Sequence, residues 1–240
     1  MKGMVKMYTF NSKIRYTELN HRKGTMDPSS IINYFQDCST FQSEELNVGL
    51  SYLKEQNRIW ILTSWQLHIL KQGKLGEVIT IGTWPYAFKG FYGYRNFIMK
   101  NEQGEILAVA DSIWANMDLG TGTPIKTSAE LSGYVLEPPY PMEHSGRKIK
   151  TPEQLQSLTP FPVKKSNIDS YNHVNNGQYI KMAEEFLPED FFVSSLRAEY
   201  RKQAVLGDII YPMIALGDNT CTIVLSDDTG KPFTILEFNK

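Results

Sequence analysis

Hydrophobic positions in the first half of the chain follow one helical pattern and then several strand patterns. After Asp27-Pro28, apolar residues recur at helical spacing as Ile31, Phe35 and Cys38. Aspartate is a common N-cap and proline suits the first helical position, so this pair predicts a helix that begins at Pro28. β-Branched and aromatic runs follow, separated by glycine-containing turns. These runs predict strands over 78–84, 97–100 and 106–117.

The second half of the chain repeats this order of elements. Residues 71–79 read KQGKLGEVI and residues 202–210 read KQAVLGDII, an offset of 131 (202 − 71). Each copy turns at Leu-Gly-acid and enters a β-branched run, because glycine permits the turn and β-branched residues favour strands. A helix is expected from about Asn175, stopped by Pro188. Its buried face should carry Tyr179, Ala183 and Phe186. Strands are expected over 209–214, 222–225 and 233–238.

Each half therefore predicts an α+β unit, a long helix that buries its apolar face against a curved antiparallel sheet. The stretch from Leu136 to Pro160 is rich in proline and polar residues, which indicates a linker. We expect an N-terminal unit over 1–135, a linker over 136–160 and a C-terminal unit over 161–240. The alternative is a chance similarity between the halves, but the shared order of elements argues against it.

Composition narrows the class of protein. A formal net charge of −1 argues against a nucleic-acid binder, which usually carries a basic excess. Cys38 and Cys221 are too few for a disulfide framework and suit a reducing compartment. His21, His68 and His144 lie in separate segments without metal-ligand spacing, so we expect neither a metal nor another cofactor.

The apolar residues are not arranged as a membrane segment. No stretch approaches the roughly 18 consecutive apolar residues of a span, and the N-terminus lacks the apolar run of a signal peptide. A cytoplasmic location without a membrane partner is therefore expected. The aromatic content of 12% fits either a thick β-rich core or a pocket lined for an apolar ligand.

The segment 167–179, which reads NIDSYNHVNNGQY, is denser in functional residue types than any other. Its polar residues lie where a loop enters the second predicted helix, and a helix N-terminus presents free N–H groups and a positive dipole end. Asp169 and His173, four residues apart, can jointly orient and activate a water there. Residues alone leave open a purely structural role, with Asp169, Asn172 and Asn175 as turn and capping residues.

The pattern Asp169-x-x-x-His173-Val174-Asn175-Asn176-x-x-Tyr179 resembles the second-half signature of the acyl-ACP thioesterases of bacteria and plant plastids. The resemblance covers nearly the whole chain from about Tyr8. Further blocks in the family's order are Arg58-Ile59-Trp60-Ile61-Leu62-Thr63, Gly82-Thr83-Trp84, Gly104-Glu105-Ile106-Leu107, Ser112-Ile113-Trp114 and Glu199-Tyr200-Arg201-Lys202. The resemblance implies a tandem double hotdog fold and hydrolysis of the thioester between a fatty acyl chain and acyl carrier protein. It also implies that the first unit holds the acyl chain and that the second supplies the catalytic residues.

Two positions of the signature depart from the family pattern. Asp169 and His173 match the family's catalytic Asp and His. Tyr171 stands where the family usually has Asn, with Asn172 one residue later, and Gln203 stands where it usually has Glu. Glutamine cannot act as a general base, although its amide can orient water or hold a carbonyl oxygen. We expect Asp169, His173, Asn172 and Gln203 to form the catalytic site, with Asp169 as the base.

The resemblance also implies the substrate contacts. Backbone N–H groups near Asn175 and Asn176 should hold the oxyanion, with Tyr171 beside them. Trp60, Thr63 and Phe35 should contact the acyl chain, although such aromatic residues also fill ordinary cores. A covalent thiol mechanism is disfavoured, because Ala204 stands where some family members have Cys.

The partners follow from the same resemblance. The expected partners are acyl carrier protein and a fatty acyl thioester. A basic stretch could meet the acidic carrier protein or be a solvated surface; it comprises Arg147, Lys148, Lys150, Lys164 and Lys165. Two rival functions are an acyl-CoA thioesterase on the same fold and a non-catalytic acyl-thioester-binding module. Acyl chain length and oligomeric state, including a homodimer, are left open.

Overall fold

The computed structural model describes residues 7–20, 24–127 and 133–240. The chain divides into two compact units, one comprising residues 1–63 and 69–145 and the other residues 64–68 and 146–240. Among the helices of the described ranges, none is long and apolar enough to cross a membrane.

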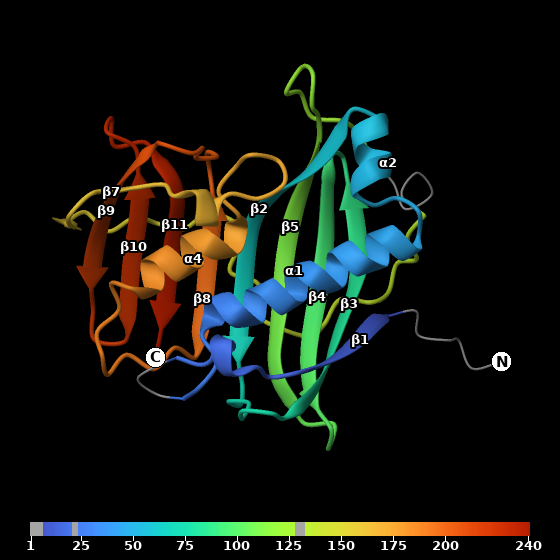
Figure 1. Ribbon diagram of the computed structural model, residues 1–240, viewed down its shortest axis with the longest axis horizontal. Helices are drawn as coiled ribbons and strands as arrows, with labels where there is room; N and C mark the ends of the chain where they lie inside the picture. Colours follow the sequence, from blue (N-terminus) through green and yellow to red (C-terminus); the bar gives the residue numbers. More distant parts are fainter. Residues whose placement is uncertain (1–6, 21–23, 128–132) are drawn as a thin grey trace. The chain divides into compact units, whose positions relative to one another are not determined.

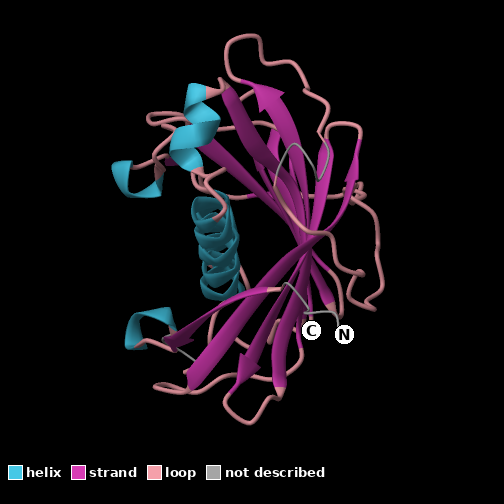
Figure 2. Cartoon of the chain, turned by 90° about the vertical axis from the view of Figure 1, so that its right-hand side faces the viewer, coloured by secondary structure: helices cyan, strands magenta, loops and turns pink. Residues whose placement is uncertain are grey.

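The first unit is one long helix covered by five antiparallel strands in the order β1-β3-β4-β5-β2 (Figure 1). Its elements are β1 (Tyr8–Lys13), the 3₁₀ turn η1 (Tyr16–Glu18), α1 (Pro28–Glu45), α2 (Leu50–Glu55), β2 (Arg58–Ile69), β3 (Val78–Lys89), β4 (Tyr92–Asn101) and β5 (Ile106–Asp118). In Figure 2, where α1 is seen nearly end-on, the helix lies inside the curve of the strands.

Helix α1 confirms the first sequence prediction. It begins at Pro28 with Asp27 as N-cap, and Ile31, Phe35 and Cys38 are all buried on its inner face. Phe35 stacks on Phe97 of β4 with ring centroids 5.2 Å apart. Burying a phenylalanine side chain of this kind typically contributes about 1.5–3 kcal/mol relative to leaving it exposed.

The second unit repeats this arrangement with a shorter helix. Its elements are β6 (Gln156–Ser157), β7 (Phe161–Pro162), η2 (Lys165–Asn167), α4 (Asn176–Glu184), β8 (Ser195–Tyr200), β9 (Ile209–Leu216), β10 (Thr220–Ser226) and β11 (Pro232–Asn239). The strand order β8-β11-β10-β9 matches β2-β5-β4-β3 of the first unit. β6 and β7 pair with β9, and residues 64–68 of β2 pair with β8.

The repeated turn confirms that the sequence repeat is structural. Gly76 and Gly207 both adopt positive φ, +76° and +92°, which glycine reaches without a steric penalty. Glu77 Oε2 accepts a hydrogen bond from the N–H three residues earlier at 2.8 Å, and Asp208 Oδ2 does the same at 3.0 Å. The acid of each Leu-Gly-acid block therefore closes its own turn.

The second helix is shorter than the sequence indicates. α4 has nine residues against eighteen in α1, and it ends at Glu184, before Phe186 and Pro188. The Phe186 N–H donates to the Ala183 carbonyl at 3.0 Å, a three-residue turn that replaces continued α-helix. Proline also disfavours helical geometry at the residue before it, so the helix unwinds earlier than Pro188 itself. Tyr179 and Ala183 are buried as predicted.

The proline-rich stretch 136–160 is divided between the two units, with residues 136–145 in the first and residues 146–160 in the second. Its first part lies in the first unit, where Trp84 Nε1 donates to the Pro138 carbonyl at 2.9 Å and the Tyr140 N–H donates to Asn96 Oδ1 at 2.9 Å. Its later part lies in the second unit. There the buried Ile149 donates its N–H to Glu199 Oε2 at 2.8 Å.

Candidate functional site

The loop before α4 is closed around the Asp169 carboxylate. Asp169 Oδ1 accepts hydrogen bonds from the N–H groups of Tyr171 at 2.8 Å and His173 at 3.3 Å. The Asp169 N–H donates to the His173 carbonyl at 2.8 Å, and a bridge between Ile168 and Val174 closes the base of the loop. This short-range pattern is an Asx turn, so the aspartate both shapes the loop and stands at its centre.

Asn172 occupies the position in this loop that demands an unusual backbone. Its φ is +63°, in the left-handed region that asparagine tolerates better than most residues, and its side chain is exposed. The structure therefore gives Asn172 a turn role and leaves its expected catalytic role as a hypothesis.

The N-terminus of α4 supplies one free backbone donor. Asn175 is the N-cap, because its Oδ1 accepts the Gly177 N–H at 2.8 Å. The Asn175 N–H is already bound to the Asn167 carbonyl at 2.9 Å. Within the described part of the chain, the Asn176 N–H has no hydrogen-bond partner. An unpaired N–H at a helix start can bind an anion or a polarised carbonyl.

A second loop is pinned beside this one through Ala204. The buried Ala204 accepts the Val174 N–H on its carbonyl at 2.9 Å, and its own N–H donates to the Tyr179 hydroxyl at 2.7 Å. The exposed Gln203 precedes Ala204, and Val174 follows His173. The structure thus brings the predicted residues Asp169, His173 and Gln203 onto two loops that are bonded to each other. Sequence reasoning missed the Tyr179 hydroxyl link, although Tyr179 is part of the signature.

His173 has an unused polar atom. Its Nδ1 is buried and has no hydrogen-bond partner among the described residues. Asp169 Oδ2 likewise accepts no hydrogen bond from them. Leaving a buried nitrogen unpaired typically costs about 1–3 kcal/mol, so folded proteins seldom leave such an atom without a structural or functional reason.

The predicted acyl contacts lie in the first unit and differ in character. Phe35 is fully buried in the core under α1, and Thr63 Oγ1 donates to the Ile113 carbonyl at 2.8 Å. Trp60 is half-buried, packs against Phe88 with centroids 6.1 Å apart, and lines a pocket. Of the three, Trp60 is the one that lines this pocket, while Thr63 is half-buried outside it.

The cysteines and histidines elsewhere show no catalytic arrangement. Burial raises the pKa of the Cys38 thiol to about 12 and that of Cys221 to about 11, so both thiols stay protonated at neutral pH. His68 Nε2 lies 3.2 Å from Gln66 Nε2, and His144 Nδ1 lies 3.7 Å from Asp111 Oδ2. His21 lies outside the described residues. Within the described ranges, no group of three or more metal-ligating side chains gathers.

Comparison with known proteins identifies relatives over most of the chain. Family models described as the acyl-ACP thioesterase N-terminal domain and C-terminal domain match residues 5–133 and 150–228. A palmitoyl-acyl carrier protein thioesterase of Gossypium hirsutum is 30% identical over 236 residues, covering 89% of this chain and 56% of that protein. An acyl-[acyl-carrier-protein] hydrolase of Cuphea viscosissima is 25% identical, with coverage of 89% and 55%. The chain thus spans about half the length of these curated relatives.

Solved structures show the same fold. An acyl-ACP thioesterase from Bacteroides thetaiotaomicron superposes with a TM-score of 0.88 at 19% identity, covering 97% of both chains. A 12:0-ACP thioesterase from Umbellularia californica gives 0.82 at 16% identity, covering 97% of this chain and 96% of that one. The predicted double hotdog fold is confirmed by these likenesses. Because the two family models together match well over half of its residues, the chain belongs to the acyl-ACP thioesterase family.

Proposed function

We propose that this chain hydrolyses the thioester of a fatty acyl group carried by acyl carrier protein and releases a free fatty acid. The observation that carries the proposal is the loop before α4. There the Asp169 carboxylate keeps one oxygen free, and His173 Nδ1 is buried without a partner. The relatives are named as a thioesterase and a hydrolase of acyl carrier protein substrates, and these names supply the substrate class.

The reaction follows from the chemistry of these groups. Asp169 accepts a proton from water as the water oxygen attacks the acyl carbonyl carbon, and the His173 side chain helps to hold that water. The negative charge that develops on the carbonyl oxygen is stabilised by the free Asn176 N–H and the positive end of α4. Collapse of the tetrahedral intermediate breaks the C–S bond, and the departing thiolate takes up the proton from Asp169.

Gln203, Asn172, Asn175 and Tyr171 have supporting roles in this proposal. The Gln203 amide orients the water without exchanging a proton. Asn172 and Asn175 fix the loop by turn and cap, and the Tyr171 ring borders the reacting thioester.

The two units contact different parts of the substrate. The second unit acts on the thioester, and the first holds the acyl chain, with Trp60, Thr63 and Phe35 along its path. Lys164 and Lys165, which are exposed at η2 just before the reactive loop, offer positive charge to the acidic carrier protein.

The test is fatty acid release from acyl-ACP by the wild type, Asp169→Ala and His173→Ala, with Ser170→Ala as the control. Ser170 is exposed in the same loop, so its variant should match the wild type. Loss of a positioned general base typically lowers the rate by about 10²–10⁴-fold. Undiminished hydrolysis by both the Asp169 and His173 variants would overturn the proposal.

The same assay separates the rival functions. Faster turnover of acyl-CoA than of acyl-ACP would identify a CoA thioesterase. Stoichiometric binding of acyl-ACP without release of fatty acid would identify a binding module, for which Gln203 in place of an acid is the motivating observation.

A further inference from the structure

The start of α4 is fastened to the end of β8 by a tyrosine. Tyr200 is the last residue of β8, and its hydroxyl donates at 2.9 Å to the carbonyl of Asn176, the first residue of α4. Glu199 faces the other side of the strand, where it accepts the Ile149 N–H and pairs with Arg201. Tyr200 is therefore the member of this block that reaches the helix after the reactive loop.

The tyrosine bond fixes the peptide next to the free donor of α4. The peptide that joins Asn176 to Gly177 is held at both ends, because its carbonyl accepts the Tyr200 hydroxyl and its N–H donates to Asn175 Oδ1 at 2.8 Å. In the preceding peptide, the Asn175 carbonyl accepts the Gln178 N–H at 2.9 Å. The Asn176 N–H, unpaired among the described residues, thus lies between fixed groups. A donor fixed in advance stabilises a developing negative charge without first having to reorient.

A second tyrosine holds Tyr200 in place. The Tyr179 ring is fully buried and packs edge-on against the Tyr200 ring, with centroids 6.0 Å apart. Burial raises the pKa of both hydroxyls above the ordinary tyrosine value, so both keep their protons at neutral pH. The Tyr179 hydroxyl in turn accepts the Ala204 N–H at 2.7 Å. The two tyrosines in contact therefore connect the start of α4 with the loop that carries Gln203.

At the equivalent positions, the first unit has neither the tyrosine nor the free donor. By the offset of 131, Tyr200 corresponds to Ile69 (200 − 131), the last residue of β2, and isoleucine cannot donate a hydrogen bond. α1 begins at Pro28 where α4 begins at Asn176, and proline has no N–H. Both units must anchor a helix on a sheet, so anchoring alone does not explain why the second unit has the hydroxyl.

We propose that Tyr200 is a positioning residue, whose hydroxyl holds the first peptide of α4 so that the Asn176 N–H is aimed at the carbonyl oxygen of the bound thioester. This role rests on the proposed function, since it serves the step in which that oxygen takes up negative charge. Because the oxyanion forms only in the transition state, loss of the Tyr200 hydroxyl should lower kcat and leave KM nearly unchanged.

The test is the steady-state hydrolysis of acyl-ACP by the wild type, Tyr200→Phe and Tyr211→Phe. Tyr200→Phe removes the hydroxyl and keeps the ring against Tyr179. Losing an oxyanion donor outright typically lowers kcat about 10²–10³-fold, so a donor that is held less well should cost about tenfold, with KM within about twofold. Tyr211 is an exposed residue of β9, so Tyr211→Phe should match the wild type.

A further pair of variants tests whether Tyr200 acts through the Asn176 N–H. Asn176→Pro removes that N–H, and the N-cap Asn175 already has φ −59° and ψ 140°, a conformation that suits a following proline. Asn176→Ala keeps the N–H and is the reference. Adding Tyr200→Phe to the Asn176→Ala protein should lower kcat about tenfold. Adding it to the Asn176→Pro protein should change kcat less than about twofold, because the donor that Tyr200 positions is already gone.

All assays are run below the melting temperature of the least stable variant, so that a fall in kcat is not a loss of folded protein. An equal fall of kcat on adding Tyr200→Phe to the Asn176→Ala and Asn176→Pro proteins would overturn the positioning role. Hydrolysis by the wild type together with an unchanged kcat in Tyr200→Phe would overturn this role alone. No hydrolysis of acyl-ACP by the wild type would overturn the proposed function as well.

Discussion

Two loops of the molecule each lead into a helix from a 3₁₀ turn, one before α1 and one before α4. Each follows a 3₁₀ turn, η1 or η2, and is closed at its base by a β-bridge, Leu19 to Met26 or Ile168 to Val174. The Asn20 N–H donates to the Thr25 carbonyl at 2.7 Å, as the Asp169 N–H donates to the His173 carbonyl at 2.8 Å. Asn20 therefore stands where Asp169 stands, and Thr25 stands where His173 stands.

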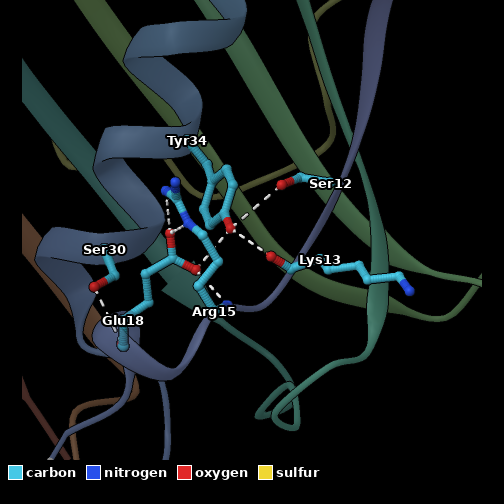
Figure 3. A network of polar contacts seen from close by, with 6 residues as sticks. All are labelled: Ser12, Lys13, Arg15, Glu18, Ser30 and Tyr34. Carbon is cyan, nitrogen blue, oxygen red and sulfur yellow. Dashed lines mark hydrogen bonds and ion pairs between the residues drawn. The ribbon is translucent and has the colours of Figure 1, made fainter.

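The difference lies in what the side chains are used for. In the first loop, Asn20 Nδ2 donates to Asp27 Oδ1 at 2.8 Å, so the amide ties the loop to the helix cap. Nearby, the buried Glu18 carboxylate accepts bonds from Arg15 and from the Tyr34 hydroxyl (Figure 3). The second loop instead leaves His173 Nδ1 unpaired. The loop before α1 therefore has a structural role, whereas the loop before α4 has residue types that suit acid–base chemistry.

The largest expected effect comes from giving the second loop the residues of the first. The double variant Asp169→Asn/His173→Thr should lower hydrolysis of acyl-ACP by about 10²–10⁴-fold, because an amide cannot take the proton of water. Its fold should survive, since an asparagine Oδ1 can accept the same N–H bonds that Asp169 Oδ1 accepts. Turnover and thermal unfolding measured together separate these two effects. The reciprocal variant Asn20→Asp/Thr25→His is the control and should gain no activity. If Asp169→Asn/His173→Thr keeps turnover within about threefold of the wild type, the loop before α4 is no more catalytic than the loop before α1.

The proline-rich stretch gives a second contrast, because each unit holds its part of it with a buried polar side chain. In the first unit Asn96 accepts the Tyr140 N–H and is itself held by Asp111. Burial raises the pKa of Asp111 to about 6, opposed by hydrogen bonds from Tyr86 and Asn96 and by the charge of His144. In the second unit Glu199 accepts the Ile149 N–H directly.

The raised pKa of Asp111 predicts a pH dependence of stability. The folded protein holds this proton more tightly than the unfolded chain, whose aspartates titrate near pH 3.9, so stability falls as pH rises from about 4 to 6. A shift of about two units corresponds to a total fall of about 3 kcal/mol. Asp111→Asn should remove that fall. Denaturant unfolding at several pH values between 4 and 7 checks this, and parallel pH profiles for variant and wild type would contradict it.

The inner tyrosines of the two helices offer a smaller contrast. The Tyr34 hydroxyl donates to Glu18 Oε2 at 2.6 Å, and the Tyr179 hydroxyl accepts the Ala204 N–H at 2.7 Å. Tyr34→Phe and Tyr179→Phe should each cost about 1–3 kcal/mol, because each leaves a buried partner unsatisfied. Only Tyr179→Phe should also lower turnover, since Ala204 holds the Gln203 loop against Val174. An equal loss of turnover in both variants would mean that Ala204 does not position the site.

Features that depend on residues adjacent in the chain can be predicted from the sequence, and features that depend on tertiary contacts cannot. The start of α1 at Pro28 and the repeated Leu-Gly-acid turn depend on residues adjacent in the chain, so both are predictable. The link from Tyr179 to Ala204 depends on which loop lies beside which helix, and no local pattern encodes that. The family resemblance identifies Asp169, but only the folded structure shows that Asn20 has the corresponding place beside the β-bridge of the first copy.

The smallest expected effects concern two equivalent surface ion pairs, which test the repeat itself. Lys71 Nζ lies 2.6 Å from Glu105 Oε2, and Lys202 Nζ lies 2.8 Å from Asp227 Oδ2. Hydrogen bonding to each lysine holds the pKa of its carboxyl partner below the usual range. The stabilisation is therefore present above about pH 4 and is lost as pH falls further.

Lys71→Gln and Lys202→Gln should each lower the melting temperature slightly at pH 7, because exposed pairs contribute little. Both falls should shrink in 1 M salt, where the screening length is about 3 Å. Lys202 Nζ also lies 5.0 Å from the Phe233 ring centroid, so part of its fall should persist in salt as a cation–π contribution. If the two falls in salt are instead equal, the ring contact contributes nothing. If Lys202→Gln lowers turnover and Lys71→Gln does not, the effect of Lys202 passes through its neighbour Gln203. The ion pair of the second copy would then support hydrolysis, and the ion pair of the first copy would not.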